Sequence, residues 1–291
     1  MLRPFIRWQT KLSDAFDKLL PEEYRLDGNT HFVREFVNPY LSSGKVIYDV
    51  GGGGSPLISA DLKKRLQLRV VGLDVDPRQL QFAPEGAYDE TICANVTTYK
   101  GKEDADIVIC QAVLEHVEDT QAAIRAICSI LKPGGVALIF VPSRNALYSR
   151  LNLIIPDSLK RALLYYVYPH TRERQGFRAY YNRCTPHDIS KLAELSGMTV
   201  ENQKLYYVSK YFSFFFPMYL IWRLWLIFFR TWRGDQAAET FSMALRKIAP
   251  ANVLSLDGAS EAERFSRGAR SDRVSFRPGK SWTCREVTEV W

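Results

Sequence analysis

The chain has 291 residues, of which 46% are apolar, and a formal net charge of +7. This length and apolar content predict one catalytic core of doubly wound size with appendages, so a second folded domain is not required. The five cysteines, at positions 93, 110, 128, 184 and 284, form no Cys-x-x-Cys pair. We therefore expect reduced thiols, and neither disulfides nor a metal site. The first eight residues lack the apolar core and cleavage site of a secretory signal peptide.

Residues 1–43 are predicted to form two helices before the first strand. Apolar residues recur at helical spacing from about residue 8 to residue 19, which indicates the first helix. A turn at residues 27–29 separates it from a second helix over residues 30–40.

Short apolar runs then alternate with helical stretches. Strands are predicted near residues 46–50, 69–74, 91–93, 106–110 and 136–141. Helices are predicted near residues 57–67, 77–82 and 119–131. This alternation is typical of a parallel sheet, so the expected fold class is α/β with a doubly wound, Rossmann-like sheet.

The predicted sheet domain, residues 44–250, contains an insertion after its fifth strand. This insertion, residues 144–188, is rich in Tyr, Arg and Leu and is expected to form a helical cap. A sixth strand near residues 198–205 and an antiparallel seventh strand at residues 240–247 complete the sheet. Residues 251–291 show little periodicity, so we expect a flexible tail there.

Residues 46–56 read Val-Ile-Tyr-Asp-Val-Gly-Gly-Gly-Gly-Ser-Pro and are the most informative part of the sequence. A buried strand that runs into four glycines marks a backbone that passes close to a ligand. Such a turn fits dinucleotides, nucleotide phosphates and S-adenosylmethionine almost equally. Asp49, two residues before Gly51, disfavours an anionic ligand and suits a sulfonium that carries an amino group. Asp74 ends the second strand, where a carboxylate can accept both hydroxyls of a ribose.

Further motifs follow in a fixed order after these two acids. They are Cys93-Ala94-Asn95-Val96, the strand Asp106 to Gln111, the stretch Ala112 to Asp119 with its Leu-Glu-His-Val, and Leu131-Lys132-Pro133-Gly134-Gly135. This ordered set resembles the class I S-adenosylmethionine-dependent methyltransferases, particularly the small-molecule and lipid methyltransferases with a Leu-Glu-His-Val helix start. The resemblance covers roughly residues 24–205.

The resemblance implies S-adenosylmethionine as the cofactor. Gly51 and Gly53 would approach its methionine part, and Asp49 would hold the amino group directly or through water. Asp74 would take the ribose hydroxyls, with Val75 beside it at the cofactor. The usual third glycine of the loop is replaced by serine at position 55, which is small enough to fit.

The same resemblance places Asn95 and Val96 beside the adenine and Gln111 beside the sulfonium. Each motif also has a purely structural interpretation. Asp74 can be a turn acid, Asn95 can cap its own loop, and His116 can be a helix-start residue satisfied by backbone. The sequence leaves these alternatives open.

The insertion at residues 144–188 follows the fifth strand and so lies at the ligand-binding edge of the sheet. Tyr180, Tyr181 and Arg183 are its candidate residues for an anionic or sugar-bearing acceptor, and a solvated charge run is the alternative. His116 is the candidate catalytic base, because a neutral imidazole titrates near the working pH.

Residues 211–232 form a second unusual segment, with nineteen nearly uncharged residues between Lys210 and Arg230. They connect the sixth and seventh strands of one sheet, so a membrane span would separate two paired strands. We expect a helix in the membrane interface, or a re-entrant hairpin broken at Pro217, with tryptophans at headgroup depth. Arg223, Arg230 and Arg233 are expected to meet anionic lipid. Packing on the protein's own core or on a second subunit is the alternative.

The sequence thus predicts methyl transfer from S-adenosylmethionine to a hydroxyl of a lipid or lipid-linked acceptor, such as a glycan or a quinone-like ring. The expected place is the cytoplasmic face of the membrane, and an oligomer is possible. No nucleic acid is expected, because the aromatic residues cluster with aliphatic ones. A nicotinamide-dependent oxidoreductase and a non-catalytic membrane module are the rival functions.

Overall fold

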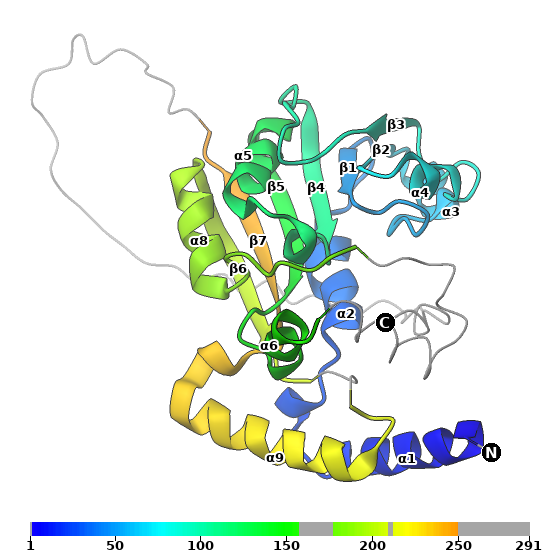
Figure 1. Ribbon diagram of the computed structural model, residues 1–291. Helices are drawn as coiled ribbons and strands as arrows, with labels where there is room; N and C mark the ends of the chain where they lie inside the picture. The colour runs from blue at the N-terminus through cyan, green and yellow to red at the C-terminus, as the bar shows by residue number, and fades with distance from the viewer. Residues whose placement is uncertain (1, 157–176, 209–211, 250–291) are drawn as a thin grey trace, which may run out of the picture. The chain divides into compact units, whose positions relative to one another are not determined.

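The computed structural model describes residues 2–156, 177–208 and 212–249 (Figure 1). The chain divides into two units, Met1–Pro250 and Ala251–Trp291. The segment expected to be a flexible tail, and part of the insertion after the fifth strand, lie outside the described residues.

A seven-stranded sheet forms the centre of the first unit, in the order β3-β2-β1-β4-β5-β7-β6 (Figure 1). The strands are β1 (Val46–Val50), β2 (Arg69–Asp74), β3 (Glu90–Cys93), β4 (Ala105–Gln111), β5 (Leu131–Pro142), β6 (Met198–Tyr206) and β7 (Thr240–Lys247). The first five strands pair in parallel, whereas β7 is antiparallel to both β5 and β6. The predicted fold class, including the antiparallel seventh strand, is confirmed.

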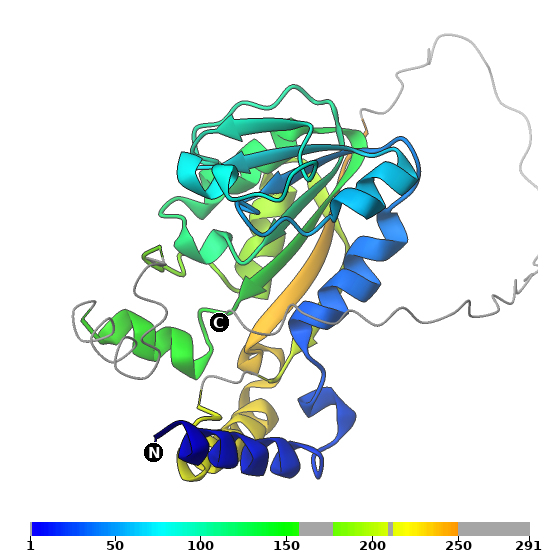
Figure 2. The ribbon, with the colours of Figure 1, turned by 90° about the vertical axis from the view of Figure 1, so that its right-hand side faces the viewer.

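Helices cover both faces of this sheet (Figures 1 and 2). The α-helices in the described residues are α1 (Leu2–Asp17), α2 (Gly28–His31), α3 (Ala60–Leu66), α4 (Pro77–Gln81), α5 (Thr120–Ile130), α6 (Leu147–Ile154), α8 (Pro186–Leu195) and α9 (Phe216–Arg233). Hydroxyl side chains cap the N-termini of two of these helices. At α3 the Ser59 hydroxyl accepts a hydrogen bond from Leu62 N, and at α8 the Thr185 hydroxyl accepts one from Asp188 N.

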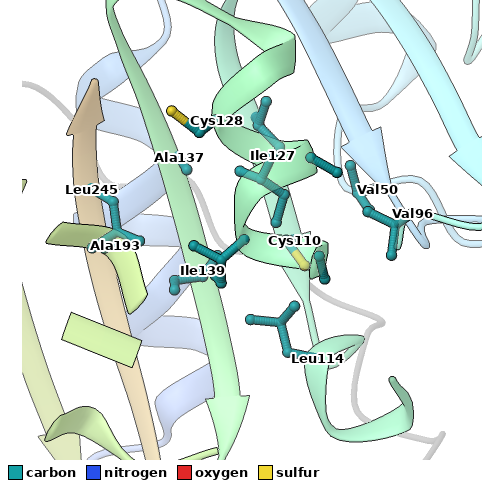
Figure 3. Close-up of a cluster of buried hydrophobic side chains, with 14 of the residues drawn as sticks. Val50, Val96, Cys110, Leu114, Ile127, Cys128, Ala137, Ile139, Ala193 and Leu245 are labelled. Atoms are coloured by element: carbon teal, nitrogen blue, oxygen red, sulfur yellow. The ribbon is translucent and has the colours of Figure 1, made fainter. Parts of the chain in front are cut away.

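The strand alternation divides the interior into two cores. Tyr48 and Val50 of β1 face the core beneath α5 and α8, whereas Ile47 faces the core beneath α3 and residues 32–37. Figure 3 shows the first core, where Ala137 and Ile139 of β5 lie near α5 and its Ile127. Because both faces are covered, β1, β2 and β4 are apolar almost throughout.

The two N-terminal helices differ from their predicted form. The first helix begins at Leu2 and not at residue 8. Its buried face includes the polar residues Gln9 and Ser13, so the spacing of apolar residues did not reveal its full length. The second is α2, followed by a π-helix over Phe32–Val37 and a 3-10 turn over Asn38–Tyr40. Proline at position 39 has no N–H to donate, so a regular α-helix cannot continue through it.

The apolar segment between β6 and β7 forms the long helix α9, with proline in its first turn. Since β6 runs in the same direction as the parallel strands, this connection lies at their carboxyl edge, beside α1 (Figures 1 and 2). Among the described residues, no helix has both the length and the apolar content that a membrane crossing needs.

The prediction that Arg223 meets anionic lipid is wrong. Its side chain is fully buried and donates to the carbonyl oxygens of Tyr24 and Tyr207, and its Nε lies 3.1 Å from Asp17 Oδ1. Trp222, also expected at headgroup depth, is 2% exposed. Both residues lie on the inner face of α9, because a helix returns to the same face every three to four residues.

Candidate cofactor and acceptor site

Four neighbouring strands bring the predicted cofactor residues to one edge of the sheet. Gly51 follows β1, Asp74 ends β2, Asn95 follows β3 and Gln111 ends β4. These strands are parallel and adjacent in the sheet, so their carboxyl ends lie side by side. This is the edge at which open α/β sheets bind their ligands.

The glycine loop after β1 lies too close to its neighbours for side chains. Gly51 has φ +76°, and a Cβ added there would lie 2.3 Å from Val113 Cγ2. Gly53 has φ +45°, and its Cβ would lie 2.9 Å from Asp74 Oδ2. Both glycines are therefore required by conformation and by space. The loop forms a bare backbone cradle between Asp74 and the turn that follows β4, as a bound S-adenosylmethionine requires.

Asp49 supports this loop from inside the protein. Its Oδ2 accepts hydrogen bonds from Leu57 N at 3.3 Å and from the Tyr88 hydroxyl at 3.2 Å. The Tyr88 hydroxyl also lies 3.3 Å from the carbonyl oxygen of Gly53. Burial raises the pKa of Asp49 to about 6. One carboxylate oxygen is thus used to hold the loop, a contact that the sequence did not reveal.

Asp74 lies under the glycine loop and is 7% exposed. Its Oδ1 accepts from Asp76 N at 2.9 Å, and burial raises its pKa. Val75, the next residue, is 53% exposed beside it. One carboxylate oxygen of Asp74 therefore accepts a hydrogen bond within the turn, and the other carboxylate oxygen faces the glycine loop.

Asn95 and Val96 are placed differently from each other. The Asn95 amide oxygen accepts from the N–H and from the hydroxyl of Thr97, both at 2.9 Å. This is the loop-capping arrangement that the sequence left open. The Val96 side chain is buried in the first core, so only its backbone faces the edge of the sheet.

Gln111 is fixed by the N-terminal segment. Its Nε2 donates to Asn29 Oδ1 at 3.0 Å, which ties the end of β4 to α2. Ala112 follows with φ +53°, a left-handed conformation that is unfavourable for a residue with a Cβ. Such backbone strain is frequent at functional sites. Asn29 was missed because nothing in the sequence pairs it with residue 111.

His116 lies in the 3-10 turn Leu114–His116 and is held in one tautomer. Its Nδ1 lies 3.1 Å from the carbonyl oxygen of Arg178, and because a carbonyl only accepts, Nδ1 carries the proton. Nε2 of the neutral ring is therefore an acceptor. Burial lowers the pKa of His116, which favours the neutral form.

Residues 177–185 are attached to the same turn. Tyr180 N and Tyr181 N both donate to the carbonyl oxygen of Glu115, and the Asn182 side chain donates to Glu118 O at 2.6 Å. The Phe177 ring lies 6.3 Å from the His116 ring and is 51% exposed. The second half of the insertion is thus fastened beside the candidate base.

The three residues predicted to contact the methyl acceptor differ in their exposure. Arg183 is exposed, with φ +52°, and Tyr180 is partly exposed with the Arg178 guanidinium 5.2 Å from its ring centroid. Tyr181 is 4% exposed and belongs to the first core, so its ring is not available to an acceptor in this structure.

Glu115 was not predicted to have a role. Its carboxyl group is 2% exposed, and Oε2 has no hydrogen-bond partner in the part of the chain that the structure describes. Burial raises its pKa to about 8. The buried acid lies on the Nε2 side of His116, with 3.9 Å between Glu115 Oε1 and His116 Nε2.

Comparison with known proteins agrees with this geometry. Residues 48–139, which include the glycine loop and the Leu-Glu-His-Val turn, match the family model described as a methyltransferase domain. Residues 48–139 therefore form a methyltransferase domain of the class I S-adenosylmethionine-dependent type. S-adenosylmethionine is the cofactor of this family, and the bare glycine cradle beside Asp74 fits it.

Similar proteins include two named ubiquinone biosynthesis O-methyltransferase. The one from Escherichia fergusonii is 36% identical over 109 residues, and the one from a Shewanella species is 33% identical over 109 residues. Each alignment covers 35% of this chain and 45% of the relative, so the chain spans less than half of their length.

A solved structure of the same fold is a chain from the Haloferax volcanii complex of the Trm112 methyltransferase activator. It has a TM-score of 0.50 and 14% sequence identity to this methyltransferase, over 84% of this chain and 97% of its own.

Proposed function

We propose that the protein transfers a methyl group from S-adenosylmethionine to a hydroxyl oxygen on a quinone-like, lipid-linked ring. The observation that carries this proposal is the position of His116, a neutral base on the turn that follows β4, next to the glycine cradle. The names of the two aligned relatives support a ring hydroxyl as the acceptor.

The bound cofactor supplies an electrophilic methyl group, and the chain's own residues position and deprotonate the acceptor. Nε2 of His116 would accept the proton of the acceptor hydroxyl, so that its oxygen could take the methyl group that the cofactor would supply. The hydrogen bond from Nδ1 to Arg178 O keeps Nε2 unprotonated beforehand. The segment 177–185 orients the acceptor and limits the access of water.

The cofactor would lie along the edge formed by the four strands. Gly51 and Gly53 would contact its methionine part, and the second oxygen of Asp74 would accept from the ribose. Val75 is exposed where it can cover the adenine, and the backbone of Asn95 and Val96 can contact the adenine edge. Gln111 would complete the sulfonium side of the site.

On the acceptor side we assign the roles to exposed residues. Phe177 can stack on an aromatic ring beside His116, and Tyr180 and Arg183 can bind its polar substituents. Tyr181 is left out of this set because its ring is buried.

We further propose that α9 docks on a membrane surface and that the protein is peripheral, on the cytoplasmic face. The outer face of α9 is apolar, and its large exposed side chains are Ile221, Leu224, Trp225, Phe228 and Trp232. Of the three arginines of α9, Arg223 and Arg230 lie on the inner face and pair with Asp17 and Glu23. The third, at the end of the helix, is Arg233, which is exposed and lies with its guanidinium 5.2 Å from the ring centroid of Trp232. Tryptophans and apolar residues on one side of a helix are typical of interfacial binding.

The position of α9 supports a membrane-resident acceptor. The helix connects β6 to β7 at the carboxyl edge, the same edge that carries the glycine loop and His116. A methyltransferase docked through this face would hold its site near the bilayer surface, where a polyprenylated ring is found.

The reaction is tested with purified protein, S-adenosylmethionine and vesicles that contain a polyprenylated catechol. We expect S-adenosylhomocysteine together with a product one methylene heavier, methylated on oxygen. Binding of S-adenosylhomocysteine without turnover on hydroxyl acceptors would favour a non-catalytic module. Tighter binding of NAD than of S-adenosylhomocysteine would contradict the cofactor assignment.

Membrane docking is tested with a variant in which Ile221, Leu224, Trp225 and Phe228 are replaced by serine. Burial of one large apolar side chain contributes roughly 2 kcal/mol, so co-sedimentation with vesicles should fall by orders of magnitude. Binding of S-adenosylhomocysteine should persist, because the glycine loop lies on other strands. A change of oligomeric state in place of lost vesicle binding would instead show that α9 covers a second copy of the chain.

A further inference from the structure

The exposed side of α1 carries two adjacent stripes. Phe5 and Trp8, 47% and 56% exposed, form an apolar stripe with ring centroids 6.2 Å apart. Arg7, Lys11 and Lys18 are exposed and recur at spacings of four and seven residues, which places them along one neighbouring stripe. Lys18 lies just beyond the helix and continues its hydrogen-bond pattern, with Lys18 N donating to Asp14 O.

The opposite side of α1 is fixed to α9 and to the residues before it. Phe216 N donates to Gln9 Oε1 at 2.8 Å, and the Ser13 hydroxyl donates to Ser213 O at 3.1 Å. The Tyr219 hydroxyl donates to Asp17 Oδ2 at 2.6 Å. These three polar contacts along the helix prevent α1 from turning about its axis. Its basic and apolar stripes are therefore turned away from these contacts, toward the outside.

Within the described ranges 2–156, 177–208 and 212–249, the side chains of Arg7, Lys11 and Lys18 form no ion pair and no hydrogen bond. By contrast, Arg230 of α9 is paired with Glu23. The outer face of α9 thus provides mainly apolar contact, with exposed Arg233 at its end, and α1 adds three further exposed cations.

We propose that α1 binds anionic phospholipid: Arg7, Lys11 and Lys18 contact lipid phosphates while Phe5 and Trp8 enter the interface. This rests on the proposed membrane docking of α9 and adds to it a requirement for lipid charge. A basic stripe beside an apolar stripe matches a bilayer surface, which presents anionic groups directly above acyl chains. Each basic residue near an anionic surface strengthens binding roughly fivefold, so three contribute on the order of a hundredfold.

The test uses the full chain and vesicles of phosphatidylcholine alone or with phosphatidylglycerol. We compare the wild type with the triple variant Arg7→Gln, Lys11→Gln and Lys18→Gln. A matched control, Lys64→Gln, Arg65→Gln and Lys191→Gln, removes the same charge from exposed positions on α3 and α8. Circular dichroism and S-adenosylhomocysteine binding verify that each variant is folded.

The wild type and the control should bind anionic vesicles about a hundredfold more tightly than neutral ones, and salt should weaken this preference. The triple variant should lose the preference and keep the weak neutral binding that α9 provides. Equal binding of the wild type to both vesicles would overturn the role of α1 while leaving docking through α9 intact. Binding to neither would overturn both proposals, as would a stable dimer that excludes lipid.

Discussion

Gly51→Ala tests the glycine cradle at its most crowded point. The substitution places a Cβ at φ +76°, a conformation that costs an L-residue roughly 1–2 kcal/mol. The same Cβ would lie 2.3 Å from Val113 Cγ2, 3.2 Å from Cγ1 and 3.3 Å from Cβ. Rotation of the valine cannot clear all three atoms, so the loop or the turn after β4 must shift.

The shift should appear in cofactor affinity. Overpacking typically costs about 1–3 kcal/mol, and the relaxed loop must be forced back when the ligand binds. We therefore expect S-adenosylhomocysteine to bind roughly ten- to a hundredfold more weakly by calorimetry. Adding Val113→Ala removes the two Cγ atoms but not the positive φ, so the double variant should recover part of the loss.

Gly44→Ala is the matched control. Gly44 has φ +78° with nothing within 4 Å of an added Cβ, so it carries the backbone strain without the clash. It lies before β1, at the opposite edge of the sheet from the loop. The control should lower the free energy of unfolding and leave affinity unchanged. A folded Gly51→Ala variant that binds like the wild type would refute the cradle.

Three further predictions follow from buried groups. His116→Asn should lower kcat/KM by roughly 10²–10⁴-fold. In the wild type, kcat/KM should fall at acidic pH as His116 is protonated, and this fall should occur below pH 6.5 because the pKa of His116 is lowered from that value. The acidic limb of the pH profile should be absent in the variant. Burial raises the pKa of Glu115 from 4.5 to about 8, so the folded state holds a proton that the unfolded state releases, and stability falls as pH rises across that interval. Glu115→Gln should remove this fall in urea unfolding at pH 5 to 9, and an unchanged pH dependence would contradict it. Arg223→Met should cost about 3–5 kcal/mol of stability, because it removes the ion-pair partner of Asp17 and the donor to the carbonyls of Tyr24 and Tyr207. By contrast, exposed Arg233→Met should stay within about 0.5 kcal/mol.

The sheet could be predicted because its signals are local. β1 is a short apolar run that stops at a glycine, β2 is one that ends at an acid, and β7 was predicted at the residues where it is found. The order of these strands brings Gly51, Asp74 and Gln111 to one edge, so the candidate site followed from the fold class.

The contacts around His116 could not be predicted, because they join distant parts of the chain. Its Nδ1 contacts the carbonyl of Arg178, 62 residues away, and the tautomer depends on that contact. Gln111 likewise depends on Asn29, 82 residues before it. Nothing in either local sequence indicates a partner, so these two contacts could not be found before the whole backbone was known.

Arg223 shows why an apolar run with one charge was misread. In the sequence the guanidinium stands alone among aromatic and aliphatic residues, which favours a position at the lipid headgroups. In the fold, the carbonyls of Tyr24 and Tyr207 and the carboxylate of Asp17 surround it, and Tyr24 lies 199 residues away. A buried charge with these partners keeps the inner face of α9 against the protein. Because two of the three arginines of α9 lie on that inner face, the outer face is mainly apolar, and most of the attraction to anionic lipid that we propose comes from the neighbouring helix α1.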